Sequence, residues 1–333
     1  MKVLLSDSTP AYLTPGGKQV HAERLYTYLN KIGVETEYDR WWDPYQKCDI
    51  LHLLGISNLC QIRLAKRTGV KVVLTQVVDD ATNSSYLYKT TLGIKNKIIK
   101  NVFPKFLTKD IPWLILNELD AIVYINKFDE QTARKIYSIK KPLVYNIPHA
   151  FDKEEIDILK NSNSLKNKTY LISVGSIIPR KNACLLAEIA LNAKIPIVFI
   201  GASMKDNDLY FRKFLNFVDN NYVKYLGFVS QVDKYELLCN ASGFVLLSDA
   251  ESGCIAVHEA ASFGLPLLLS NKPWSHAYPN PRNIHYTNTS KISDIKKDLV
   301  DFYNISKRHE VQSFNVLTWN EVALAYKKVY DQL

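Results

Sequence analysis

The sequence predicts an α/β protein built from two Rossmann-like domains with parallel sheets. Short apolar runs of strand length alternate with helical stretches, which is the order expected of parallel strands covered by helices. The succession strand, loop, helix, strand opens the chain at residues 2–38 and recurs at residues 170–200. With 333 residues, the chain is long enough for two domains with separate cores. We expect these domains to face each other across a cleft.

The individual elements follow from apolar periodicity and from glycine or proline at their ends. In the first half we expect strands at residues 2–5, 34–38, 50–54, 70–74 and 121–125, and helices at 25–32 and 59–67. In the second half we expect strands at 170–174, 195–200, 223–228, 244–247 and 267–269, and helices at 183–191, 234–239, 254–263 and 319–333.

A change of composition near residues 146–152 marks the domain boundary, because a charged, Asn- and Ser-rich stretch, 153–168, follows it. We place the first domain at residues 1–148 and the second at 149–317, with 318–333 forming the last helix. His52 lies in an apolar strand, so we expect a core histidine with hydrogen-bond partners, not a catalytic one.

Composition indicates a globular cytoplasmic protein. Hydrophobic residues make up 47% and charged residues 23% of the chain, and no apolar run approaches the ~18 residues of a membrane span. The first residues become polar too soon for a signal peptide. The five cysteines lack metal-site spacing, which fits a reducing compartment. The net charge of +9 is concentrated in residues 1–150, with 21 basic and 14 acidic side chains. That surplus is compatible with nucleic acid, an anionic membrane or an acidic substrate.

Two carboxylates, Glu251 and Glu259, are the first candidate site residues. Glu259 lies about two turns up a predicted helix whose other residues are almost all apolar, and a buried carboxylate there needs a hydrogen-bond donor. The two backbones should be about 12 Å apart, a span that suits an extended nucleotide diphosphate. Alternatively, Glu251 only complements the helix N-terminus and Glu259 is a solvated helix residue.

Two further motifs indicate anion binding. Arg180 and Lys181 follow a predicted strand and precede a helix, where they can stabilise a departing diphosphate. Gly16 and Gly17 stand at the mouth of the first helix, where a ligand can approach free backbone N–H groups. Alternatively, the cations are an ordinary exposed pair and the glycines a simple turn.

These motifs resemble those of retaining glycosyltransferases of family 4, which have the two-domain GT-B fold. The stretch from Glu251 to Glu259, followed by Gly264-Leu265-Pro266, resembles the family's E-x7-E signature. Residues 174–182 resemble its phosphate loop, and Gly16-Gly17 its N-terminal glycine loop. The sequence departs from the family pattern at three places: Ser176 replaces a phosphate-binding arginine, Gln76 a histidine, and His149-Ala150 an Asn-Gly pair.

The resemblance implies transfer of a sugar from a nucleotide-sugar to an acceptor with retention of configuration, without a metal or other cofactor. It implies that Glu259 binds the ribose hydroxyls and that Lys181 and Arg180 bind the diphosphate. It also implies that Glu251 and the backbone of 253–255 hold the sugar, and that main chain from Gly227 to Val229 contacts the base. The donor-binding set is therefore Glu259, Gly253, Cys254, Ile255, Gly227, Val229, Gly16 and Gly17, and the catalytic set is Glu251, Lys181 and Arg180. The last helix should cross back to the N-terminal domain, which would bind the acceptor.

A basic amphipathic segment precedes Asp110. It contains six lysines: Lys89, Lys95, Lys97, Lys100, Lys105 and Lys109. Seven apolar residues interleave with them: Ile94, Ile98, Ile99, Val102, Phe103, Phe106 and Leu107. Such a segment can lie on an anionic membrane, which would point to a lipid-linked acceptor for surface-polysaccharide assembly. Equally, its apolar face can pack on the core and its lysines remain solvated.

Two other functions stay open. A nucleotide-sugar epimerase or hydrolase would keep the donor site and lack an acceptor cleft. A basic nucleic-acid-binding protein would explain the charge and leave Glu259 unexplained, so we expect no nucleic acid partner.

Overall fold

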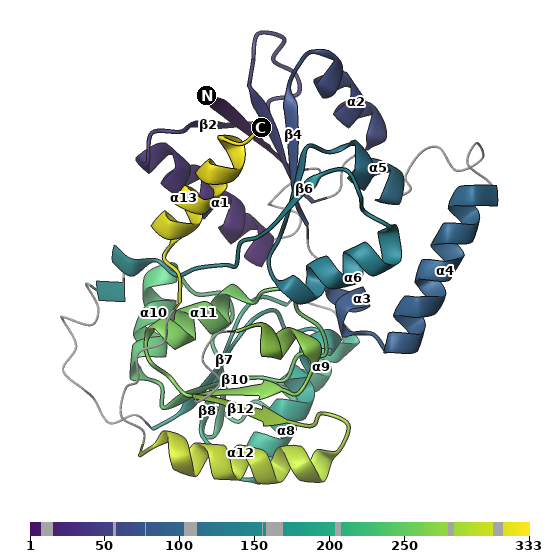
Figure 1. Cartoon of the computed structure of the whole chain (residues 1–333). Coiled ribbons are helices and arrows are strands. Elements are labelled where there is room, and N and C mark those ends of the chain that lie inside the picture. Colours follow the sequence, from purple (N-terminus) through teal and green to yellow (C-terminus); the bar gives the residue numbers. More distant parts are fainter. Residues whose placement is uncertain are drawn as a thin grey trace. The chain divides into compact units, whose positions relative to one another are not determined.

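The computed structural model describes residues 1–7, 16–55, 58–76, 78–102, 112–154, 156–157, 169–203, 208–278, 283–308 and 316–333. The chain divides into two compact units (Figure 1). Unit 1 comprises Met1–His149 with Leu317–Leu333, and unit 2 comprises Ala150–Val316. Most of the loop before Gly16, the segment 103–109 and residues 158–168 of the charged stretch 153–168 lie outside the described residues.

Unit 1 contains a six-stranded parallel sheet in the order β2-β1-β3-β4-β5-β6. Its strands are β1 Lys2–Ser6, β2 Glu35–Tyr38, β3 Ile50–Leu54, β4 Lys71–Gln76, β5 Ala121–Tyr124 and β6 Leu143–Asn146. Its helices are α1 Gly17–Lys31, α2 Leu59–Arg67, α3 Asp79–Asn83, α4 Tyr86–Val102, α5 Pro112–Glu118, α6 Lys127–Tyr137 and α13 Trp319–Tyr330. The strand order reverses between β1 and β3, which defines a switch point where ligands bind in such sheets.

The last helix, α13, belongs to unit 1, where it packs along α1. Two buried hydrogen bonds attach it to the sheet, and a third links their two partners within the sheet. His52 uses Nδ1 to bond the Tyr330 hydroxyl (2.7 Å) and Nε2 to bond Thr75 Oγ1 (2.8 Å), and Thr75 Oγ1 also bonds the Tyr326 hydroxyl (2.9 Å). His52 is therefore a core histidine with both ring nitrogens bonded, as expected. Thr318 begins α13 with a capping box that includes Glu321.

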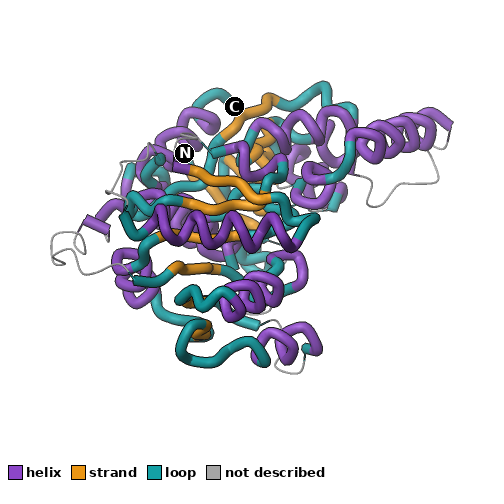
Figure 2. Tube along the Cα trace, turned by 90° about the horizontal axis from the view of Figure 1, so that it is seen from below, coloured by secondary structure: helices purple, strands orange, loops and turns teal. Residues whose placement is uncertain are grey.

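Unit 2 contains a second six-stranded parallel sheet in the order β12-β11-β10-β7-β8-β9. Its strands are β7 Leu171–Val174, β8 Ile197–Ile200, β9 Val223–Tyr225, β10 Gly243–Leu246, β11 Leu267–Ser270 and β12 Ile284–Thr287. Its helices are α8 Ala183–Asn192, α9 Leu209–Leu215, α10 Gln231–Asn240, α11 Ile255–Ser262 and α12 Ile292–Ser306, with 3₁₀ turns η1 Pro179–Lys181 and η2 Pro273–Ala277. Strands appear as orange segments among purple helices in Figure 2.

Both faces of the second sheet are buried, because alternate residues of its strands enter separate cores. Phe244 and Leu246 belong to one core, and Val245 and Leu247 to the other. This double burial explains why the strands read as continuous apolar runs without polar alternation. The two parallel Rossmann-like sheets predicted from the sequence are thus confirmed.

Several predicted elements have different bounds in the structure: α1, for example, begins at Gly17 and not at residue 25, and β9 and α10 differ for identifiable reasons. β9 is only three residues long, because Gly227 adopts φ +68° and turns the chain away from the sheet. α10 begins at Gln231 instead of residue 234, because Ser230 caps it by accepting the N–H of Asp233 (3.1 Å).

Candidate active site

The candidate site lies at the carboxyl edge of the unit 2 sheet, where the strand order reverses between β7 and β10. Lys181 lies in η1, which follows β7, and Glu251 lies in the loop after β10. The Lys181 Nζ is 2.9 Å from Glu251 Oε1, and the Ser248 hydroxyl donates to the same oxygen (2.8 Å). Two predicted catalytic residues 70 positions apart therefore form an ion pair at the switch point of the sheet.

Arg180 joins this pair from its outer side. Its Nη1 lies 3.5 Å from Glu251 Oε2 and also donates to the carbonyl oxygen of Ala250. The main chain connects the same two loops, because the Arg180 carbonyl accepts the N–H of Asp249 (2.8 Å). The structure thus brings the three predicted catalytic residues together.

Burial and charge act in opposite directions on these groups. Burial alone would raise the pKa of Glu251, but Lys181 and Arg180 outweigh it and hold that pKa below its ordinary value. Burial would lower the pKa of Lys181, but Glu251 outweighs it and raises that pKa. Both groups are therefore charged at neutral pH, with the ammonium fixed at the edge of the sheet.

Two glycines make room for the lysine. A Cβ atom on Gly175, which directly follows β7, would lie 2.8 Å from Lys181 Nζ and 3.0 Å from its Cδ. A Cβ on Gly201, after β8, would lie 2.2 Å from the Gly175 carbonyl oxygen. Both glycines have positive φ, +151° and +142°. The absence of side chains here lets the lysine and two backbone segments share a narrow space.

The start of α11 brings the predicted sugar-binding backbone to the same edge. Cys254 is the N-cap of α11, and Gly253 and Ile255 flank it. The Cys254 N–H donates to the Tyr278 hydroxyl (2.9 Å), and the Trp274 indole donates to the Ser248 carbonyl (3.0 Å). These two aromatic residues, which the sequence did not single out, support the loop on both sides.

Glu259 is buried, as its apolar helix suggested, and the protein itself satisfies one of its oxygens. Oε1 accepts hydrogen bonds from Lys234 Nζ (2.7 Å), the Tyr235 hydroxyl (3.3 Å) and Gln231 Nε2 (3.4 Å), all on α10. The carboxylate is thus neither solvated nor dependent on a ligand for every partner. From the described residues, Oε2 receives no hydrogen bond.

The predicted base-binding main chain, Gly227 to Val229, lies in the loop between β9 and α10. Its Gly227 carbonyl accepts the N–H of Gly201 (2.8 Å), which ties this loop to the end of β8. Phe228, which lies between Gly227 and Val229 in the sequence, is 80% exposed. An exposed aromatic ring in this loop offers a stacking surface that main chain alone does not supply.

Unit 1 carries the remaining predicted residues, Gly16 and Gly17, at the start of α1. Gly16 is the N-cap and has no side chain to cap the helix, and a Cβ on it would meet no atom of the described residues within 4 Å. Lys18 lies beside them: its ammonium pairs with Asp7 after β1 and would lie 3.2 Å from a Cβ on Gly55 after β3. Among the described residues, none therefore covers Gly16 at the start of α1.

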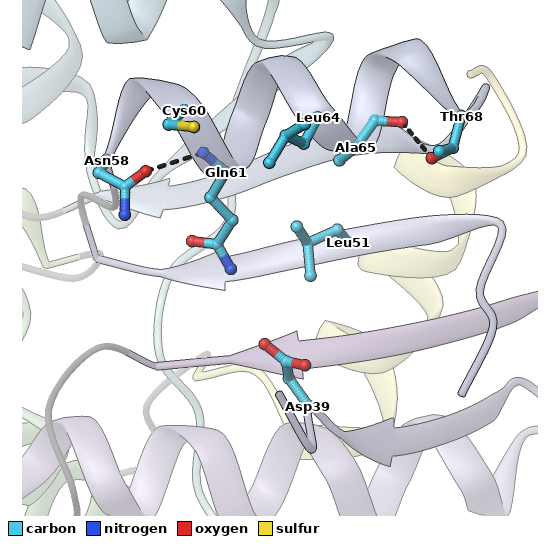
Figure 3. Close-up of a pocket in the computed structure, with 8 residues that line it drawn as sticks. All are labelled: Asp39, Leu51, Asn58, Cys60, Gln61, Leu64, Ala65 and Thr68. Carbon is cyan, nitrogen blue, oxygen red and sulfur yellow. Dashed lines mark hydrogen bonds between the residues drawn. The ribbon is translucent and has the colours of Figure 1, made fainter. Parts of the chain in front are cut away.

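A groove of about 570 Å³ lies elsewhere in unit 1, between α2 and the end of β2 (Figure 3). It is lined by Asp39, Leu51, Asn58, Cys60, Gln61, Leu64, Ala65 and Thr68. None of these is a predicted site residue. No three His, Cys, Asp or Glu side chains of the described residues are grouped as a metal site. Within the same part of the chain, no helix has the length and apolar character to cross a membrane.

Two Rossmann-like units with a helix returning to the first are the GT-B fold of glycosyltransferases. Residues 154–290 match the family described as "Glycosyl transferases group 1". No individually curated protein matches the chain.

Solved structures agree with the fold over the whole length. Sucrose-phosphate synthase from Thermosynechococcus elongatus has a TM-score of 0.69 and 14% identity, with 100% of this chain and 99% of that chain covered. Anabaena HepE, solved in complex with UDP and glucose, has a TM-score of 0.63 and 12% identity, with both chains fully covered (100% each). WaaG, described as a glycosyltransferase involved in lipopolysaccharide biosynthesis, has a TM-score of 0.58 and 13% identity, with 98% of this chain and 95% of that chain covered.

Proposed function

We propose that the protein is a retaining glycosyltransferase that moves a sugar from a nucleotide-sugar to a glycan or lipid-linked acceptor. The observation that carries the proposal is the Lys181–Glu251 pair, held 2.9 Å apart at the switch point of unit 2. The Lys181 ammonium is fixed at this edge, beside Gly175 and Gly201, the glycines that follow β7 and β8. A cation in that position can stabilise a diphosphate that gains negative charge as it leaves. The match of residues 154–290 to group 1 glycosyl transferases supports the same assignment.

In this proposal the nucleotide-sugar lies along the carboxyl edge of the second sheet. The diphosphate contacts Lys181. The Lys181 ammonium has three N–H donors, so it can bond Glu251 and still donate to the diphosphate. The N–H groups of Gly253 and Ile255 bind the sugar at the positive end of α11, where the Cys254 N–H is bonded to the Tyr278 hydroxyl. The ribose hydroxyls bond Oε2 of Glu259, and Phe228 stacks on the base. That HepE is solved with UDP and glucose supports a nucleotide-sugar as the donor.

The transfer step needs no protein nucleophile. The bond between the anomeric carbon and the diphosphate breaks, and the acceptor hydroxyl bonds that carbon on the same face. The acceptor proton passes to an oxygen of the leaving phosphate. Lys181 and Arg180 stabilise the negative charge that forms on the diphosphate, and Glu251 keeps both cations in place.

The test is a screen of nucleotide-sugars for thermal stabilisation, followed by product analysis with the best donor. We expect one donor to raise the melting temperature, and its sugar to appear on an acceptor with unchanged anomeric configuration by NMR. Release of free sugar regardless of acceptor would identify a hydrolase, and an inverted product would exclude retention. Stabilisation by random DNA or RNA and by no nucleotide-sugar would overturn the assignment.

Lys181→Ala tests the site directly. We expect kcat/KM to fall about 10²-fold or more, the scale for removing one group that stabilises charge in the transition state. Lys297→Ala, which removes an exposed lysine on α12, is the matched control and should keep full activity. Near-normal turnover of Lys181→Ala would show that the phosphate site lies elsewhere.

A further inference from the structure

α4 is attached to unit 1 along one side, by its contact with α6. A Cβ on Gly93 would lie 2.8 Å from the Lys135 carbonyl oxygen, so the two helices approach closely there. Asn96 donates its amide to the Ile136 carbonyl (3.0 Å), and Lys89 donates to the Thr82 carbonyl (2.6 Å). The closest contacts of α4 with the protein are therefore made by a glycine and polar groups.

Four apolar residues of α4 lie on the other side, whereas Leu92 and Ile99 are half-buried. Leu87, Ile94, Ile98 and Val102 are 72%, 55%, 54% and 60% exposed. At 3.6 residues per turn they form one stripe along the helix, roughly opposite Asn96. This arrangement is the reverse of a helix that packs its apolar face on the core, which the sequence left as an equal alternative. An exposed apolar stripe of this kind, here with Thr91 between Leu87 and Ile94, marks an interaction surface.

The charges beside the apolar stripe of α4 distinguish three possible partners: a second copy of the chain, nucleic acid and an anionic bilayer. Lys95 and Lys97 are exposed and flank the apolar stripe on its two sides, about 80° from its centre. No acidic residue occurs between residues 81 and 109. A second copy of the same face would bring lysines against lysines, and nucleic acid would leave the apolar stripe without a counterpart. An anionic bilayer satisfies both features, because acyl chains receive the stripe and headgroups receive the ammonium groups.

In both views α4 is the outermost helix of unit 1 on the side of α6 (Figures 1 and 2). We propose that α4 is a membrane-docking helix, which lies in the interface of an anionic bilayer with Leu87, Ile94, Ile98 and Val102 toward the acyl chains. Two tyrosines at the start of the helix, Tyr86 and Tyr88, are 79% and 53% exposed and suit the headgroup level. This inference goes beyond glycosyl transfer and does not depend on it.

The experiment measures sedimentation of the full chain with vesicles of phosphatidylcholine alone or mixed with phosphatidylglycerol. We expect binding only to the anionic vesicles, weakening with salt because exposed charges are screened within about 10 Å at 0.1 M. Lys95→Gln with Lys97→Gln should weaken partitioning about 25-fold, at roughly fivefold per lysine. Lys296→Gln with Lys297→Gln, exposed neighbours on α12, is the matched control and should bind normally.

Ile94→Ser with Ile98→Ser tests the apolar stripe. We expect it to abolish binding while the melting temperature stays at the wild-type value, because both side chains face away from α6. No wild-type binding to anionic vesicles at low salt would overturn the proposal, and so would equal losses in the α12 control. A dimer seen by light scattering that Ile98→Ser dissociates, without lipid binding, would assign the face to a second copy. Vesicle binding needs no nucleotide-sugar, so its failure is distinct from failure of the proposed function.

Discussion

Glu251→Gln should destabilise unit 2 strongly, although it barely changes the size of the side chain. The substitution leaves the Lys181 ammonium, 13% exposed, beside a neutral amide. At 2.9 Å the attraction between the two charges is about 6 kcal/mol for an effective dielectric constant of 20, and desolvation of the ions opposes it. Removing one partner of a buried pair costs about 3–5 kcal/mol, because the other charge stays buried.

The measurement is a double-mutant cycle with Lys181→Met, using chemical denaturation and thermal melting. A loss of 3–5 kcal/mol corresponds to roughly 6–20 °C for a domain of this size. Removing both charges should cost less than the sum of the single changes, with a coupling energy of about 1–3 kcal/mol. Glu236→Gln, an exposed glutamate on α10, is the control and should stay within about 0.5 kcal/mol of wild type.

The pH dependence gives an independent check. Glu251 has a lowered pKa, so its contribution is present above the ordinary value of 4.5 and disappears as pH falls through the folded value. Lys181 has a raised pKa, so its contribution is present below 10.5 and disappears as pH rises through the folded value. The penalty of Glu251→Gln should therefore be constant between these limits and vanish in strong acid. An additive cycle, or a penalty equal to that of Glu236→Gln, would refute the reasoning.

Three further predictions concern a glycine, a second ion pair and a buried histidine. Gly175→Ala should lower kcat/KM by displacing the ammonium that lies 2.8 Å from the new Cβ. Gly69→Ala, at φ +83° with no atom within 4 Å, should cost only about 1–2 kcal/mol of stability, so equal kinetic losses would contradict the argument. Glu259→Gln should weaken nucleotide-diphosphate binding by about 1.5–3 kcal/mol in calorimetry. Lys234→Met should instead lower the free energy of unfolding by about 3–5 kcal/mol. If Glu259→Gln leaves nucleotide affinity unchanged, the Glu259 carboxylate has a purely structural role. Burial lowers the pKa of His52 to about 3 from 6.5, so stability should decline as pH falls between these values, and His52→Gln should flatten that decline in pH-dependent unfolding.

The fold could be predicted from local sequence because its strands are buried on both faces. Runs such as Ile197–Ile200 and Leu267–Leu269 stay apolar throughout, and glycine or proline ends the neighbouring helices. Element ends were less predictable, because they depend on single capping groups. The hydroxyl of Ser230 caps α10, so the helix begins at Gln231. The first turn of this helix has no apolar periodicity from which its start could be predicted.

The site could be predicted only in part, because its contacts join distant segments. The chemistry of Arg180, Lys181 and Glu251 was readable as three charged residues near strand ends, but their mutual pairing was not. Lys234, which bonds Glu259 across 25 positions, sits on a polar helix face that looks solvated in sequence. Phe228 likewise gives no periodic signal, because only the turn at Gly227 exposes it.

The orientation of α4 could not be read from sequence either, because an amphipathic pattern does not say which face packs on the protein. Gly93 and Asn96 were the useful signals. A glycine permits close helix contact, and a buried asparagine needs the carbonyl that α6 supplies. Roles that depend on bound substrates, such as those of Gly16 and Gly17, stay predictions.

The return of α13 to unit 1 has a consequence for biosynthesis. The bond between His52 and Tyr330 joins residues 278 positions apart, so the ribosome makes all of unit 2 before unit 1 can complete its core. During that interval the side of α1 that receives α13 is exposed, and such transient apolar surface favours aggregation. We expect a released chain that ends at residue 316 to carry a folded unit 2 and to recruit chaperones through unit 1. Synthesis of residues 317–333 is then the step that allows the first domain to complete its core.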